Sequence, residues 1–200
     1  MYIPQHFAGP SEKEALELIR QTSFGTITSA GPDGLNATHL PFLVDEYEGE
    51  SCLMGHFARA NDHWSYISRY DAMIVFAGPD CYISPTWYVS PNVPTWNYVA
   101  VHVYGNVQIL DDNDSKHRIV LELSDVQERK LPNPWIPDYD ESMLNAIVGF
   151  RFHISRIQVK QKLSQNKSAA DRNSAVDALL SSGSENQIAI AQLMKQSLRS

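Results

Sequence analysis

The sequence predicts a mainly β fold of the α+β class, an antiparallel barrel, closed or split, with peripheral helices. Three observations indicate it. Short runs rich in β-branched and aromatic residues recur along the chain, and turn residues separate them. Helical periodicity is confined to a few segments between these runs. The chain has 200 residues, of which 43% are hydrophobic, and this is enough for one domain with a sizeable core.

The N-terminal half is expected to form a helix followed by strands joined through hairpins. Ser11 and Glu14 have the spacing of a capping box and predict a helix over residues 12–21. The turn sequence at residues 31–34, Gly-Pro-Asp-Gly, predicts a hairpin between its flanking strands. The expected strands are 24–29, 36–45, 51–57, 72–77 and 81–84, with a helix over 61–69.

The C-terminal half centres on residues 93–110. A Pro-bounded aromatic turn at residues 94–98 is expected to lead into a strand that alternates out to Leu110. The other expected elements are a helix capped by 111–114 and ending near 129, a Pro-rich connection, a strand over 147–162, and two helices separated at 181–184. We expect residues 1–165 to form the barrel domain and residues 166–200 to be a helical extension of it.

The composition of the chain limits which partners it could bind and in which cellular compartment it could be found. The net charge of −7 disfavours non-specific coating of nucleic acid, because each phosphate contact needs a Lys or Arg. Cys52 and Cys81 are too few for a disulfide framework and are expected to be buried small hydrophobes. The N-terminus does not resemble a signal peptide, and no apolar stretch approaches about 20 residues. We expect a cytoplasmic protein that does not enter membranes.

Common catalytic fingerprints are absent from the sequence. It contains no GxGxxG opening a helix, no Walker loop, no GxSxG elbow and no HExxH. Rossmann dehydrogenases, P-loop NTPases and serine hydrolases are therefore disfavoured. No acid–base pair is recognisable, and we assign no catalytic or metal-binding residue.

The segment from Gly55 to Asn61 is the first candidate for a binding site. It is expected to join a strand to a helix, where backbone N–H groups and the guanidinium of Arg59 could meet an anion. The alternative is a helix cap beside an exposed arginine.

Histidines and aromatic residues supply further candidates. His39 and His56 are expected on adjacent strands of one hairpin and could line one pocket; hydrogen-bonded structural histidines are the alternative. The aromatic residues could frame a planar ring system, or cover a barrel end or a dimer interface. They are Tyr82, Trp87, Tyr88, Trp96 and Tyr98. The C-terminal helices are only mildly basic and do not contain an evident DNA-recognition helix.

Several motifs give the chain a resemblance to the PaiB family, the FMN-binding negative transcriptional regulators. They run from the Met-Tyr-Ile-Pro start through ATHLPF (37–42), GHFARAN (55–61), YISPTWY (82–88) and VPTWNY (93–98) to KLSQNK (162–167). Lys167 departs from the family motif, which often carries Arg there.

The resemblance implies an FMN-binding split barrel of the Greek-key type, a homodimer with flavin between its subunits, and the phosphate near Arg59 and Asn61. It also implies repression of protease-production and sporulation genes. Relatives of the same fold hold haem. The cofactor-binding residues expected on this basis are Arg59, Asn61, His56, His39, Trp96, Asn97, Tyr98 and Ser84.

Four hypotheses follow from the sequence. The first is a PaiB-like, dimeric, flavin-binding transcriptional regulator, with DNA as a partner that the charge does not reveal. The second is an FMN-dependent oxidoreductase or flavin reductase, in which the flavin would carry the chemistry. The third is a haem-binding split-barrel protein, motivated by the strand histidines His39, His56, His102 and His153. The fourth is a barrel dimer with an empty cleft.

Overall fold

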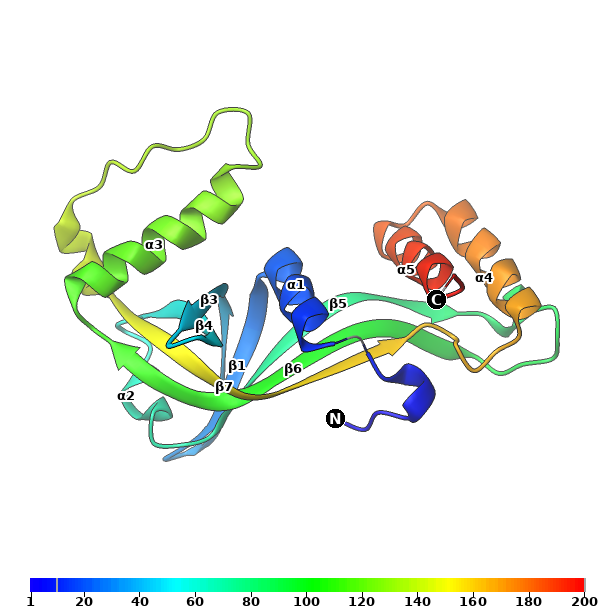
Figure 1. Cartoon of the computed structure of the whole chain (residues 1–200), viewed down its shortest axis with the longest axis horizontal. Coiled ribbons are helices and arrows are strands. Elements are labelled where there is room, and N and C mark those ends of the chain that lie inside the picture. The colour runs from blue at the N-terminus through cyan, green and yellow to red at the C-terminus, as the bar shows by residue number, and fades with distance from the viewer. Residues whose placement is uncertain (10, 200) are drawn as a thin grey trace. The chain divides into compact units, whose positions relative to one another are not determined.

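A computed structural model describes residues 1–9 and 11–199 of the chain (Figure 1). It separates into two compact units, each made from more than one stretch of sequence. The barrel unit comprises Glu12–Phe76 and His102–Ile157, and the terminal unit comprises Met1–Ser11, Ala77–Val101 and Gln158–Ser200. The prediction that residues 166–200 extend the domain of residues 1–165 stays a prediction.

Seven antiparallel strands form one sheet in the order β2-β1-β5-β6-β7-β4-β3. They are β1 (Phe24–Gly31), β2 (Gly34–Pro41), β3 (Leu43–Tyr47), β4 (Glu50–Ala58), β5 (Ala72–Ile83), β6 (Thr95–Leu110) and β7 (Ile147–Lys162). The helices are α1 (Glu12–Thr22), α2 (Trp64–Ile67), α3 (Asn113–Glu128), α4 (Ala169–Ser182) and α5 (Glu185–Gln196). Short 3-10 turns are η1 (Gln5–Phe7), η2 (Pro85–Trp87) and η3 (Glu141–Ala146).

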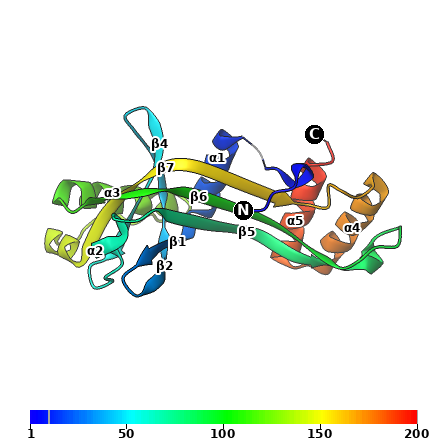
Figure 2. The same cartoon turned by 90° about the horizontal axis from the view of Figure 1, so that it is seen from below.

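The barrel unit is a sheet that curls back on itself. In Figure 2 the β1–β2 and β3–β4 hairpins extend from opposite sides of the three long strands. The end of β2 nevertheless approaches β4, and a Cβ on Gly55 would meet the Pro41 carbonyl oxygen at 3.0 Å. Glycine therefore permits this near-closure. Inside, Phe42 contacts Phe76 and Phe150 edge-on, which fills the core of the split barrel that the sequence predicts.

The predicted strand over residues 36–45 is wrong, because it is two strands in the structure. β2 pairs with β1 and ends at Pro41, whereas β3 pairs with β4 and begins at Leu43. Proline has no N–H to continue the ladder, and Phe42 turns its ring into the core while its N–H donates to the Ser23 carbonyl over 2.7 Å. The chain thereby passes from one end of the sheet order to the other within two residues.

The break expected between the strands over 72–77 and 81–84, and the turn expected at residues 94–98, are also wrong, since residues 78–80 and 95–98 are strand. β5 continues through Pro79, beyond Val75, where its pairing with β1 stops, so one edge of the strand has no neighbour in β1 at this proline. β6 begins at Thr95 and includes the aromatic segment that follows.

The helices largely follow their capping signals. In α3, the Asp112 carboxylate accepts from the Ser115 N–H at 2.8 Å. In the terminal unit, α4 begins after a Ser168 cap, and Gly183 ends it at φ 77° in the left-handed region. The predicted helix over 61–69 is shorter, with only Trp64–Ile67 helical. No helix within the described residues is long and apolar enough to cross a bilayer.

The terminal unit has its own core. The inner faces of α4 and α5 pack on the end of β5, on Tyr88 and on Leu163. Its buried residues are Cys81, Ile83, Tyr88, Leu163, Ala175, Val176, Leu179, Ile190, Ala191 and Met194. Both cysteines are free and buried, and burial raises the pKa of Cys81 to about 11, which keeps it a neutral thiol.

Candidate functional site

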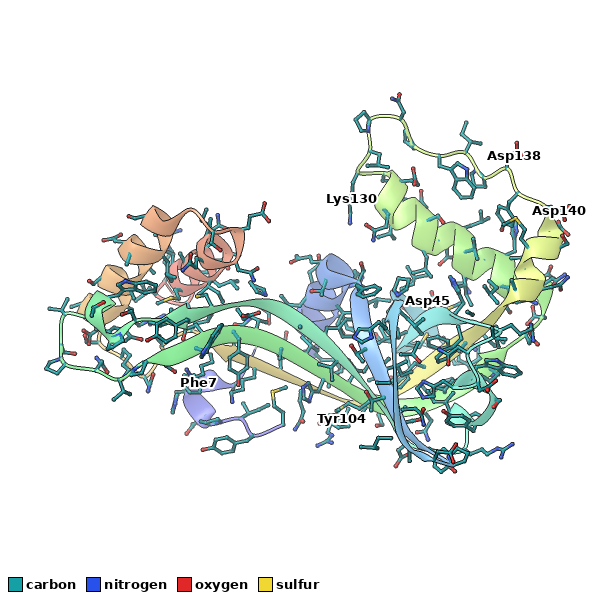
Figure 3. All side chains as sticks on the ribbon, turned by 180° about the vertical axis from the view of Figure 1, so that it is seen from behind. Phe7, Asp45, Tyr104, Lys130, Asp138 and Asp140 are labelled. Atoms are coloured by element: carbon teal, nitrogen blue, oxygen red, sulfur yellow. The ribbon has the colours of Figure 1, made fainter. Side chains whose placement is uncertain are left out.

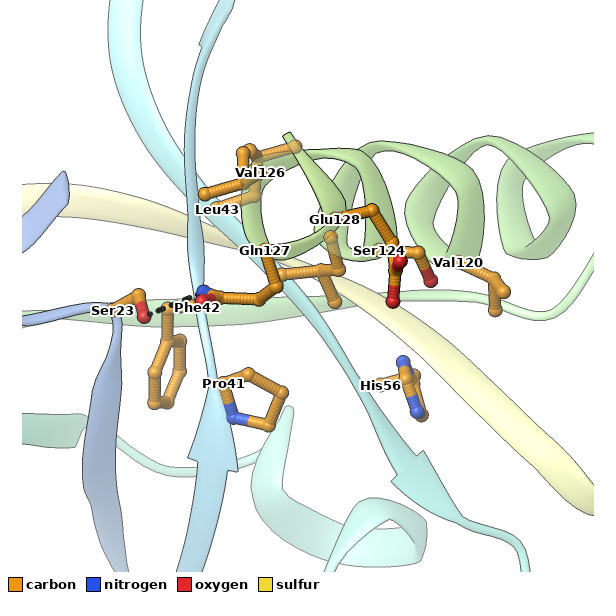
Figure 4. Close-up of a pocket in the computed structure, with 11 residues that line it drawn as sticks. Ser23, Pro41, Phe42, Leu43, His56, Val120, Ser124, Val126, Gln127 and Glu128 are labelled. Carbon is orange, nitrogen blue, oxygen red and sulfur yellow. Dashed lines mark hydrogen bonds between the residues drawn. The ribbon is translucent and has the colours of Figure 1, made fainter. Parts of the chain in front are cut away.

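Two cavities in the barrel unit meet at His56 on β4. The first, of about 340 Å³, lies between β2–β4 and the inner face of α3 (Figure 4). Its walls are Ser23, Pro41, Phe42, Leu43, His56, Val120, Leu123, Ser124, Val126, Gln127 and Glu128. The second, of about 300 Å³, is lined by His56, Val120, Trp135, Tyr139, Met143, Leu144 and Ile147. Their walls are mainly apolar, so a flat hydrophobic group would be compatible with them.

His56 has a polar atom without a partner. Its Nδ1 is buried and makes no hydrogen bond within the described part of the chain. Burial lowers the pKa of the imidazole, so the ring is neutral near pH 7. A buried nitrogen left unbonded at a cavity wall costs free energy on folding, and a ligand that supplied a partner would recover that cost.

His63 shows the opposite arrangement. Its Nε2 lies 3.0 Å from Ser29 Oγ and its Nδ1 lies 2.9 Å from Thr38 Oγ1. Its side chain is almost fully buried, with the rings of Phe57 and Tyr66 beside it. With both nitrogens bonded, His63 is part of the frame of the barrel unit.

Asn61 belongs to the same network as His63. Its Nδ2 donates to Thr38 Oγ1 over 3.1 Å, and its Oδ1 accepts from the His63 N–H at 3.1 Å. The backbone N–H of Asn61 donates to the Ala58 carbonyl. These amides are therefore occupied within the chain, and the four-residue α2 is too short to add a helix dipole of consequence.

Arg59 is fixed by several acceptors. Its Nη2 and Nη1 donate to the two carboxylate oxygens of Asp111 at 2.5 and 3.1 Å, and its Nε donates to the Asn145 carbonyl at 2.7 Å. The ion pair raises the pKa of Arg59 and lowers that of Asp111. A phosphate at this position would have to share the guanidinium with Asp111, and the role of Arg59 in binding phosphate stays a prediction.

His39 does not border either cavity beside His56. It is exposed on β2 and stacks on Phe24 with ring centroids 6.3 Å apart. The expectation that the two histidines lie on adjacent strands is wrong, because β2 pairs with β1 and β4 lies between β3 and β7. A shared role of His39 and His56 in binding a cofactor stays a prediction.

The remaining predicted site residues lie in the terminal unit. Trp96 is 55% exposed and meets Tyr82 edge-on at 6.2 Å, while Tyr98 is half-buried. Asn97 is 0% exposed, and its Nδ2 donates to Ser164 Oγ over 3.0 Å. Ser84 caps η2 by accepting from the Thr86 N–H. In the structure, Asn97 and Ser84 therefore have internal partners, and their contact with a cofactor stays a prediction.

Sequence reasoning missed two parts of the site. One is the α3 wall, where Val120, Leu123 and Gln127 recur at helical spacing and line the cavity that His56 borders. The other is Asp111, which the sequence offers only as a helix-capping residue and which binds Arg59. No group of three or more His, Cys, Asp or Glu within the described residues could hold a metal ion.

Comparison with known proteins places the chain in a family. The family described as "Putative FMN-binding domain" matches residues 1–156. The chain belongs to this family. It is also 33% identical to the Protease synthase and sporulation protein PAI 2 of Bacillus subtilis, over 205 aligned residues that cover 100% of this chain and 99% of that protein. The resemblance to the PaiB family is thus confirmed.

Two solved structures are similar in fold to this chain. The flavocytochrome Anf3 of Azotobacter vinelandii superposes with a TM-score of 0.61 at 14% identity, covering 80% of this chain and 72% of that one. The FAD and haem binding protein of Mycobacterium smegmatis gives a TM-score of 0.61 at 14% identity, covering 84% and 78%. These likenesses confirm the split-barrel architecture.

Proposed function

We propose that the chain binds FMN and acts as a cytoplasmic, homodimeric transcriptional regulator of the PaiB type. The full-length match to PAI 2 carries this proposal, because it extends over both units. The family to which the chain belongs supports the choice of FMN.

In the barrel unit, the surroundings of His56 are compatible with a flavin ring, whereas the ion pair of Arg59 would compete with the flavin phosphate. The unbonded Nδ1 of His56 lies at the wall of mainly apolar cavities, which suits a planar ring that carries hydrogen-bonding atoms. The guanidinium of Arg59 is already paired with Asp111, a carboxylate that Lys116 also contacts. We therefore assign His56 to the ring, and we assign Arg59 to the phosphate through a guanidinium shared with Asp111.

FMN would supply redox chemistry when bound, and in a regulator its binding can act as the signal. The residues of the chain would bind and orient it. The apolar side chains of Val120 and Leu123 would exclude water from the ring, and the neutral imidazole of His56 would offer one hydrogen bond.

The FMN test is a titration followed by absorbance and calorimetry. The wild-type chain is expected to bind FMN with perturbed flavin absorbance. His56→Leu should weaken binding about tenfold, the worth of one buried hydrogen bond. His6→Leu is the matched control, since His6 is exposed and lies in the other unit. Equal affinity in His56→Leu and wild type would remove His56 from the site, and no FMN binding at all would remove the cofactor.

The proposal of a homodimer is supported by an exposed apolar strip after α3. Leu131, Trp135, Ile136 and Met143 are 51%, 43%, 81% and 63% exposed in this stretch. Apolar side chains gathered at a surface are typical of an interface. Light scattering at micromolar concentration is expected to give twice the 22.5 kDa of the chain, and Ile136→Lys should shift it toward monomer. A wild-type monomer would contradict the dimer.

The regulatory role rests on the similarity to PAI 2 alone. The chain carries a net charge of −7, so its DNA binding must come from a local surface and should be salt-sensitive. Gel-shift assays with promoter fragments at moderate salt, with and without FMN, would test it. Failure to bind any fragment in either state would leave the flavin proposal standing and remove the regulatory one.

Haem is the second candidate ligand, because a neutral imidazole with an unbonded nitrogen at a cavity wall is a potential axial ligand. Both structural neighbours described above carry haem or cytochrome in their names. Titration with haem is expected to give a Soret band that His56→Leu abolishes. A featureless titration would dismiss haem.

A further inference from the structure

A third cavity of the barrel unit lies between α3 and the segment that follows this helix. Its volume is about 390 Å³, and its walls are Leu121, Ser124, Asp125, Glu128, Arg129, Pro134, Trp135 and Pro137. The members from α3 recur at helical spacing, so one side of the helix forms one wall. Five of the eight residues border neither cavity beside His56, namely Leu121, Asp125, Arg129, Pro134 and Pro137. This cavity is therefore a separate space.

The chain after α3 returns along the helix and forms the opposite wall. Figure 3 shows the stretch between the labelled Lys130 and Asp140 running back beside α3. A hydrogen bond fixes it to the helix, because the backbone N–H of Trp135 donates to Glu128 Oε2 over 2.7 Å. Prolines at positions 134 and 137 restrict the backbone on both sides of Trp135. The wall is thus formed before any ligand binds.

The indole of Trp135 gives the cavity an aromatic wall. Its ring stacks on that of Tyr139 with centroids 6.1 Å apart, and the Tyr139 hydroxyl lies 2.8 Å from His117 Nδ1. Trp135 nevertheless remains 43% exposed. An indole that is held by a neighbouring ring and is still accessible can pack on an apolar group and attract a cation to its face.

The charged walls of the cavity leave one negative charge without a counter-charge. Asp125 forms an ion pair with Arg129, one turn later on the helix. Glu128 has no ion-pair partner among residues 1–9 and 11–199, and the Trp135 N–H occupies only one of its carboxylate oxygens. The Glu128 side chain is partly buried, so water and salt screen its charge less than that of a fully exposed carboxylate. A single positive charge would balance these walls.

The surrounding sequence adds to this preference for a cation. Residues 111–141 contain nine acidic and four basic side chains, a net charge of −5 within a chain of −7. Such a concentration of negative charge attracts cations. No group of three or more His, Cys, Asp or Glu in the described residues could hold a metal ion. The apolar walls at Leu121, Pro134 and Pro137 instead suit a cation that carries an apolar group.

We propose that the cavity between α3 and residues 134–137 binds a small organic amine that carries an apolar group. The ammonium would bind the free oxygen of Glu128, and the apolar group would pack on Trp135 and Leu121. This proposal does not rest on the FMN proposal, because the ligand carries the opposite charge to a phosphate and the cavity does not include His56.

The test is calorimetric titration of the full chain, without FMN, with benzylamine, benzyl alcohol and ammonium chloride. Benzylamine, a cation near pH 7, is expected to bind at least about tenfold more tightly than neutral benzyl alcohol, because only the cation pairs with Glu128. The ammonium ion has no apolar group and should not bind detectably. Added salt should weaken the binding of benzylamine and leave that of benzyl alcohol unchanged.

Two substitutions separate the contribution of charge from that of the aromatic wall. Glu128→Gln should weaken benzylamine binding about tenfold, although its amide oxygen can still accept from the Trp135 N–H and so keep the wall in place. Trp135→Leu should weaken the binding of both benzylamine and benzyl alcohol, since it removes the ring on which either would pack.

Two control variants should bind benzylamine as the wild type does. Asp114→Asn removes the same charge from an exposed position in the first turn of α3, outside the cavity. His56→Leu alters the cavities proposed for the flavin and none of the walls of this one.

Three results would overturn the proposal. The first is that the wild type does not bind benzylamine, which leaves the FMN proposal as it stands. The second is that Glu128→Gln, folded by circular dichroism, binds benzylamine as tightly as the wild type, or is weakened no more than Asp114→Asn. The third is that His56→Leu abolishes the binding, which would place the amine in the cavities proposed for the flavin.

Discussion

In the barrel unit His63 is buried and His56 is partly buried with a buried Nδ1, and the surroundings of the two rings differ. His63 has a hydroxyl at each ring nitrogen, whereas Nδ1 of His56 has no partner within the described chain. The His56 residue borders two cavities. When both ring nitrogens of a histidine are hydrogen-bonded within the chain, folding already satisfies the ring. When one nitrogen of a histidine beside a cavity has no partner, a ligand could supply the missing hydrogen bond. The difference separates a structural residue from a candidate ligand contact where sequence alone could not.

The largest expected effect is on His63. Replacing it in His63→Leu removes two hydrogen bonds and leaves the Ser29 and Thr38 hydroxyls short of partners, so the free energy of unfolding should fall by about 2–3 kcal/mol. Urea unfolding followed by circular dichroism would measure it. His39→Leu, on an exposed strand position, is the control and should change stability by less than about 0.5 kcal/mol. A loss in His63→Leu no larger than in this control would break the comparison.

The same substitution at His56 should have the opposite sign. His56→Leu removes a buried unbonded nitrogen from apolar surroundings, so the free energy of unfolding should stay constant or rise by up to about 1 kcal/mol. The same urea experiment without ligand measures it. Destabilisation comparable to that of His63→Leu would mean that His56 is also a structural residue.

The pH dependence sharpens the comparison further. Burial lowers the pKa of His56 and of His63 from the ordinary 6.5, so the unfolded chain binds protons on these residues before the folded chain does. Their contribution to stability is fully present above pH 6.5 and is lost as the pH falls through the lowered folded values. Urea midpoints between pH 7.5 and pH 5 should therefore decrease, and less steeply in His56→Leu. An identical slope in the variant would contradict the assignment of a lowered pKa to His56.

The smallest expected effect concerns Arg59, whose bonds are satisfied but exposed. Asp111→Asn would release the guanidinium from its carboxylate and should raise FMN affinity a few-fold if Arg59 meets the phosphate. The free energy of unfolding should fall, because the nearly buried Lys116 ammonium pairs with Asp111 Oδ1 at 3.3 Å and would lose its carboxylate. FMN titration of wild type and variant measures the effect. Asp114→Asn is the control, because Asp114 is exposed in the first turn of α3, just after Asp111. Equal FMN affinities in all three proteins would show that Arg59 does not bind the phosphate.

The sequence predicted much of the fold because local signals agreed with it. Capping side chains begin α3 and α4, and the turn at residues 31–34 joins β1 and β2 in a hairpin. The errors occurred where pairing with strands distant in sequence determines where a strand begins or ends. Pro79 lies in β5 beyond the end of its pairing with β1, and the break at Pro41 separates β2, which pairs with β1, from β3, which pairs with β4. Both outcomes involve pairing between residues distant in sequence.

For the candidate site, residue types were easier to predict than partners. The sequence offers Arg59, Asn61 and His56 as site candidates, and this stays a prediction. The hydrogen-bond partners of Arg59 and Asn61 are Asp111 and Thr38, and α3 forms one wall of the cavity beside His56. Such pairings join residues tens of positions apart, and no local pattern encodes them. The buried state of Asn97 likewise follows from Ser164 and Met194, which the strand pattern does not reveal.

The hydrogen bonds of residues 1–9 affect the order in which parts of the chain dock during synthesis. Lys160 donates to the Tyr2 carbonyl, Ala8 bridges to Lys160, and Gly9 donates to the Val159 carbonyl. During synthesis, residues 1–9 leave the ribosome well before β7 (Ile147–Lys162), so they cannot dock on it until it has followed. At about 5–20 residues per second that delay is on the order of ten seconds or more. The opening segment is thus the last part of its strand neighbourhood to dock, and until then it is available to chaperones and proteases.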